Sequence, residues 1–167
     1  MQCLENDAVW KYLDQTPWAQ KLLDQAIARS ETRKPGEVRT AAKSPAVFLI
    51  DYRDGLKAAA FMLTGAVSDF TVALDVEGAA QPLSLLMWLE NGKPYGHFAC
   101  LVRNIEEMFE TGVPPYPVER TLLTSGILDF VMESRFRGYK RISTPELDVR
   151  YRMDAKSHYC HEASGVA

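Results

Sequence analysis

Four short apolar segments lie close together between residues 46 and 89, and they constrain the fold more than any other part of the sequence. They cover residues 46–50, 56–63, 70–76 and 83–89. The sequence Asp54-Gly55 between the first two is typical of a tight hairpin turn, because it tolerates positive φ angles. Short connections join antiparallel strands, whereas parallel strands need crossovers of a dozen or more residues. The pattern therefore predicts an antiparallel meander.

The apolar character of this sheet extends to both of its faces. Segments 46–50, 56–63 and 83–89 carry apolar residues on both faces, while 70–76 alternates apolar and more polar residues with the period of a strand. The two amphipathic helices expected after the sheet, over residues 97–111 and 117–137, can cover only one of its faces. A large exposed apolar patch is rare on a soluble monomer. We therefore expect the open face to bind either a missing domain, which the resemblance described below implies to be N-terminal, or a second copy of the chain.

Helical patterns flank the sheet. The Thr16-Pro17 pair is a favourable helix start and introduces apolar residues at helical spacing to about residue 29. Further helices are expected over residues 7–12, 97–111 and 117–137, an exposed loop over 31–45, and a last edge strand over 147–151. The sequence thus predicts an α+β fold, with a mostly antiparallel open sheet of four to six strands and helices packed on one face. Residues 1–153 are expected to form a single domain, followed by a flexible tail over residues 154–167.

Composition and charge exclude several classes of function. A formal net charge of −3 argues against sequence-independent nucleic-acid binding, which needs many basic residues on one face. No apolar run reaches the roughly 18 residues that a membrane span needs, and the first residues do not resemble a signal peptide. Three widely separated cysteines indicate reduced thiols rather than a disulfide framework. We expect a cytoplasmic protein that binds neither nucleic acid nor membranes.

Few residues have the pattern of a functional site. The sequence contains no glycine-rich dinucleotide motif after a strand, so this chain is expected to hold no cofactor. His97 lies at a predicted helix start, where an imidazole could act as an acid or base or simply cap the helix. Glu119 and Arg120 lie in the first turn of the longest predicted helix, where Arg gains nothing from the helix dipole. It could bind a hydroxyl-rich or anionic partner, or pair with Glu106 or Glu110.

Four sequence segments together resemble one family. They are Tyr52-Arg53-Asp54-Gly55-Leu56, Ile105-Glu106-Glu107-Met108-Phe109-Glu110-Thr111-Gly112, and the run from Pro115 to Gly126, with Arg141-Ile142-Ser143-Thr144-Pro145 after them. In this order they resemble the C-terminal part of bacterial proteins related to the Gfo/Idh/MocA oxidoreductases, the glucose–fructose oxidoreductase and inositol dehydrogenase family. The likeness extends from about Cys3 to Tyr151.

The resemblance implies a C-terminal α+β domain that contributes to substrate binding and oligomer contacts. In that family NAD(P) and the catalytic Lys of a Glu-Lys-Pro motif belong to the N-terminal domain, and this sequence has no Glu-Lys-Pro. Our first hypothesis is therefore a substrate-side and oligomerisation domain of an oxidoreductase-like protein acting on a sugar or polyol, inactive in isolation. His97, Glu119 and Arg120 would then contact a hydroxylated ligand. The alternative hypothesis is a non-enzymatic, self-associating structural module that uses the open sheet face as its dimer interface.

Overall fold

The computed structural model describes residues 1–87, 89–90, 92–93 and 95–153. The chain divides into two compact units. The first comprises Met1–Trp88 and Ile127–Thr144, and the second comprises Leu89–Gly126 and Pro145–Ala167. The predicted flexible tail, residues 154–167, lies outside the described residues, and the predicted single domain over residues 1–153 stays a prediction.

Five strands in the first unit are all antiparallel, which confirms the α+β class. Strands β1 (Gln2–Glu5), β2 (Ala46–Asp51) and β3 (Lys57–Met62) form one sheet in the order β1-β2-β3. Strands β4 (Phe70–Leu74) and β5 (Leu83–Met87) form a separate two-stranded sheet. The hairpin predicted around Asp54-Gly55 is present as β2–β3, but the strands form two small sheets rather than the single predicted meander.

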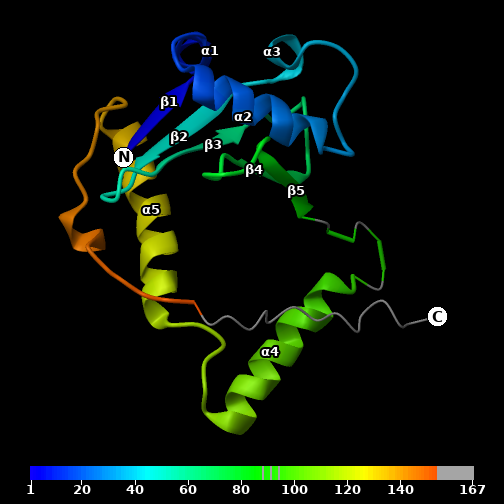
Figure 1. Ribbon diagram of the computed structural model, residues 1–167, viewed down its shortest axis with the longest axis vertical. Helices are drawn as coiled ribbons and strands as arrows, with labels where there is room; N and C mark the ends of the chain where they lie inside the picture. The colour runs from blue at the N-terminus through cyan, green and yellow to red at the C-terminus, as the bar shows by residue number, and fades with distance from the viewer. Residues whose placement is uncertain (88, 91, 94, 154–167) are drawn as a thin grey trace. The chain divides into compact units, whose positions relative to one another are not determined.

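Helices α1 (Asp7–Asp14) and α2 (Pro17–Ala28) pack on one side of these strands (Figure 1). The core is apolar and consists of the buried side chains of Leu13, Ala19, Leu23, Ile27, Leu63 and Ala66, with Phe61 of β3 packed against it. Pro17 occupies the first helical turn, as the sequence predicted, since its missing N–H leaves no hydrogen bond unmade there. Within the first unit, α1 and α2 thus supply the helical side of the core.

The expected loop over residues 31–45 contains a short helix, α3 (Val38–Ala41), which corrects the prediction. Its partly buried side chains Val38 and Ala41 pack against the core. The backbone passes close to Gly65, where a Cβ atom would lie 2.8 Å from the Ala41 carbonyl oxygen. Gly65 also has a φ of 96°, a conformation that favours glycine. A residue without a side chain therefore lets α3 approach the core.

The free edge of β1 is closed by the C-terminal part of α5 (Val118–Phe136) and the segment after it. The buried Ser134 hydroxyl accepts a hydrogen bond from the Cys3 backbone N–H (3.0 Å) and donates one to the Lys140 carbonyl (2.6 Å). Further along the edge, the Ile142 N–H donates to the Met1 carbonyl at 2.8 Å. Exposed strand edges are templates for unwanted pairing, so these contacts protect β1.

The second unit contains α4 (His97–Thr111), the first part of α5 and a 3-10 turn, η1 (Pro145–Leu147). Gly112 ends α4 in the left-handed conformation, with a φ of 70°. The predicted edge strand over residues 147–151 is absent: η1 replaces its beginning, and residues 148–153 are irregular. The apolar side chains of Leu101, Val102, Ile105 and Phe109 on α4 are exposed.

Candidate functional site

The sequence-predicted site residues all lie in the second unit, but they do not form one cluster. His97 is the first residue of α4, and its ring lies against Phe98 with 4.4 Å between the ring centroids. Its Nδ1 atom is buried and has no hydrogen-bond partner among the described residues. The fifteen residues of α4 span about 22 Å. His97 lies at the end of α4 that is remote from the connection to α5.

Glu119 and Arg120 lie at the other end of this connection, in the first turn of α5. The Arg120 guanidinium lies over the Tyr116 ring, 4.4 Å from its centroid, which is cation–π geometry. Among the described residues Arg120 forms an ion pair with neither Glu106 nor Glu110, contrary to the alternative weighed from the sequence. No contact joins His97 to Glu119 or Arg120 in this part of the chain, so a shared ligand stays a prediction.

A pocket that the sequence analysis did not identify lies in the first unit, between α1, α2 and the segment that contains α3. Its volume is about 330 Å³, at the lower end of the roughly 300–1,000 Å³ that is typical of small-molecule sites. The floor is apolar and consists of Trp10, Leu13, Leu23, Ile27 and Val38. Three of these, Leu13, Leu23 and Ile27, also belong to the buried core.

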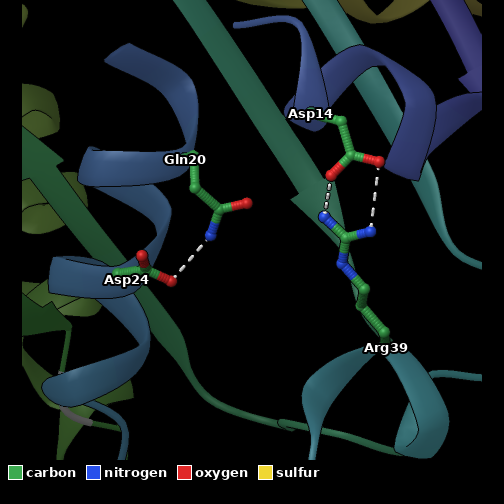
Figure 2. Close-up of polar contacts among 4 residues, drawn as sticks. All are labelled: Asp14, Gln20, Asp24 and Arg39. Atoms are coloured by element: carbon green, nitrogen blue, oxygen red, sulfur yellow. Dashed lines mark hydrogen bonds and ion pairs between the residues drawn. The ribbon is translucent and has the colours of Figure 1, made fainter. Parts of the chain in front are cut away.

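The rim of the pocket is polar and consists of Gln20, Asp24, Arg33, Glu37 and Arg39. Figure 2 shows two pairs of side chains here. The Arg39 guanidinium donates to both carboxylate oxygens of Asp14, one of them at 3.3 Å. The Gln20 amide nitrogen donates to Asp24 Oδ1 at 2.9 Å, one helical turn away on α2. Gln20, Asp24 and Arg39 are thus each held by a side-chain hydrogen bond.

The Asp14–Arg39 pair neutralises the Arg39 charge. Its hydrogen bonds lower the pKa of the Asp14 carboxyl and raise that of the Arg39 guanidinium. The same guanidinium lies over the Trp10 ring, 5.5 Å from its centroid. Arg39 therefore lines the pocket with its positive charge compensated by Asp14. The pair is exposed, so its contribution to stability is small.

Arg33 differs from Arg39 in that it has no ion pair among the residues described by the structure. Its backbone is nevertheless anchored on both sides. The Thr32 N–H donates to Asp69 Oδ2 at 3.1 Å, and the Lys34 N–H donates to the Ala66 carbonyl at 2.9 Å. An anchored backbone with an uncompensated cation is a favourable arrangement for binding an anion.

Asp69 organises the segment that carries Arg33. Its carboxylate accepts hydrogen bonds from the Ser30 hydroxyl (2.7 Å) and from the backbone N–H groups of Glu31 (2.8 Å) and Thr32. In return, the Thr32 hydroxyl oxygen accepts from the backbone N–H groups of Ser68 and Asp69. Partial burial raises the pKa of the Asp69 carboxyl, but these hydrogen bonds outweigh burial and lower the pKa overall.

A second candidate feature is an apolar surface on the β4–β5 sheet, here called the outer face. Directly opposite residues of antiparallel strands share a face. The register pairs Phe70 with Met87, Val72 with Leu85 and Leu74 with Leu83, so these six apolar side chains lie together. Five of the six are exposed, from 48% for Leu85 to 59% for Phe70, and Val72 is half-buried.

The opposite face of this sheet lies toward α2. Arg29, at the end of α2, donates to the Ser84 hydroxyl at 2.9 Å, and Lys21 pairs with Asp75 at 3.3 Å. Ser84 pairs with Ala73 in the register, and Asp75 directly follows β4 on that same face. The alternation in residues 70–76 is typical of a strand with one solvated face. In the structure the apolar side chains occupy that solvated face.

The described residues contain no group of three or more His, Cys, Asp and Glu side chains that could hold a metal ion. Within the same residues, no helix is long and apolar enough to cross a membrane. No protein-family model, curated protein or solved structure matches the chain. The resemblance to Gfo/Idh/MocA proteins therefore stays a prediction from the sequence.

Proposed function

We propose that this chain is a self-associating protein module whose outer face binds the outer face of a second copy. The observation that carries the proposal is that six apolar side chains share one side of the β4–β5 sheet and that five of them are exposed. Contiguous apolar patches of this kind on soluble proteins are frequently interaction sites. The proposal corresponds to the alternative hypothesis from the sequence.

The chemistry of the outer face favours a second copy over a partner of different chemistry. None of the six side chains is charged or can form a conventional hydrogen bond. A polar or charged partner surface would lose hydration without gaining a compensating contact. An identical apolar face has no such cost, and a two-fold arrangement brings the same patch from each copy together.

The area predicts a dimer that dissociates on dilution. Five large apolar side chains, each of roughly 150–200 Å² and about half exposed, leave on the order of 400–500 Å² per copy. The total of about 900 Å² is below the roughly 1,200–2,000 Å² of standard stable interfaces. Interfaces below the standard size are typical of weak or transient association. We therefore expect dissociation in the micromolar range.

The other hypothesis, a substrate-side domain of a sugar- or polyol-directed oxidoreductase-like protein, depends on the sequence resemblance alone. Its candidate residues His97, Glu119 and Arg120 do not contact one another among the described residues. The sequence motifs support this hypothesis, and no contact among the described residues adds further support. No cofactor is assigned to the chain under either hypothesis.

Light scattering after size-exclusion chromatography, over a concentration series from about 1 to 200 µM, tests self-association. We expect the wild type to shift from monomer to dimer, and Leu85→Lys to stay monomeric at every concentration. Leu56→Lys is the matched control, because Leu56 is 58% exposed at the tip of the β2–β3 hairpin, outside the outer face. A monomeric wild type at 200 µM, or a Leu85→Lys dimer with unchanged circular dichroism, would refute the proposal.

A further inference from the structure

We infer that the pocket between α1, α2 and α3 is a binding site for a small apolar monocarboxylate, with Arg33 as the residue that binds the carboxylate. This inference is independent of the proposed self-association, because the pocket and the outer face share no residue. It follows from three features of the pocket: an apolar floor, three rim side chains that are already paired (Gln20, Asp24 and Arg39), and the uncompensated cation of Arg33.

The floor determines the body of the ligand. Leu13, Leu23 and Ile27 are buried core side chains that also line the pocket, and Trp10 adds an aromatic surface beside them. A ligand seated on this floor excludes water from aliphatic and aromatic carbon, so its own body must be apolar. The volume of about 330 Å³ accommodates a single aromatic ring or a short aliphatic chain.

The rim determines the charged end of the ligand. Arg39 is compensated by Asp14, whereas Arg33 has no ion pair among the described residues. A guanidinium presents parallel N–H donors that match the two oxygens of a carboxylate. The backbone anchors on either side of Arg33, from Thr32 to Asp69 and from Lys34 to Ala66, limit the entropy that binding would cost.

The acidic members of the rim limit the ligand to one negative charge. Asp24 and Glu37 line the same pocket as Arg33. A phosphate or dicarboxylate would place a second negative charge near these side chains, and like charges close together are unfavourable. Gln20 donates to Asp24 through its amide nitrogen, which leaves its carbonyl oxygen free to accept from a ligand hydroxyl or amide.

Titration of the full chain with 3-phenylpropionate, followed by ligand-observed NMR or calorimetry, tests this site. A ligand of this size is expected to bind with a dissociation constant of about 0.1–1 mM. The alcohol 3-phenylpropan-1-ol has the same body without the carboxylate, and benzyl phosphate carries more charge. We expect both to bind at least about tenfold more weakly.

Two pocket variants and one control variant locate the site. Arg33→Gln should weaken 3-phenylpropionate binding at least about tenfold. Arg150→Gln, an exposed arginine outside the pocket, should leave binding unchanged. Val38→Trp should fill the pocket from α3 and abolish binding, with circular dichroism showing that the variant is folded. The inference would be overturned if saturable binding were absent up to about 10 mM, if the acid and the alcohol bound equally, or if Arg33→Gln had no effect.

Discussion

Replacing Ser134 with alanine should destabilise the first unit by far more than its small size suggests. Ser134 is fully buried, and its hydroxyl joins the Cys3 N–H on one side to the Lys140 carbonyl on the other. Ser134→Ala removes both hydrogen bonds and leaves the Cys3 N–H buried without a partner. A lost hydrogen bond costs about 1 kcal/mol, and an unsatisfied buried group costs roughly 1–3 kcal/mol. We therefore expect the free energy of unfolding of Ser134→Ala to be about 2–4 kcal/mol lower than that of the wild type.

Urea unfolding monitored by circular dichroism measures this loss. Every variant should be compared at one fixed protein concentration, because self-association would add to the apparent stability. Ser143→Ala is the matched control: Ser143 is exposed and has no hydrogen bond among the described residues, so its loss should change stability by no more than about 0.5 kcal/mol. A Ser134→Ala variant as stable as Ser143→Ala would refute the role of Ser134 in closing the edge of β1.

Three further substitutions test other contacts. Hydrogen bonds lower the pKa of the Asp69 carboxyl below its ordinary 3.8. The stabilisation that this carboxylate contributes is therefore complete above pH 3.8 and is lost as the pH falls through the folded-state pKa. The free energy of unfolding of Asp69→Asn should consequently depend less steeply on pH between about 5 and 2 than that of the wild type. Gly65→Ala should lower the free energy of unfolding by at least about 1–3 kcal/mol, measured in urea, because its Cβ would collide with the Ala41 carbonyl and its φ is 96°. Arg39→Gln should cost less than about 1 kcal/mol, yet an NMR titration should show the pKa of Asp14 returning toward its ordinary value.

Local sequence patterns predicted most of the regular elements. The helix after Thr16-Pro17 and the hairpin around Asp54-Gly55 occur where they were expected, because their determinants are a few neighbouring residues. The predicted strand over residues 147–151 is wrong. Alternation over five residues is weak evidence for a strand. The described residues of the second unit form no strand with which this segment could pair.

The candidate site was much less accessible to prediction. Arg39 lies in a segment without apolar periodicity, and nothing near it in sequence indicates that Asp14 lies within hydrogen-bonding distance. The pocket combines residues from α1, α2 and α3, so it exists only after tertiary packing. The outer face was partly foreseeable: the sequence predicted an uncovered apolar face, but only the register reveals which six side chains form it.

The sharing of Leu13, Leu23 and Ile27 between the core and the pocket floor has an evolutionary consequence. A substitution that reshapes the floor also changes the hydrophobic packing of the first unit, so most such changes would be removed by selection for a folded protein. Residues of the rim, which are mostly exposed, are free of this constraint. Relatives with altered ligand preference should therefore diverge at positions 33, 37 and 39 while retaining the aliphatic residues beneath them.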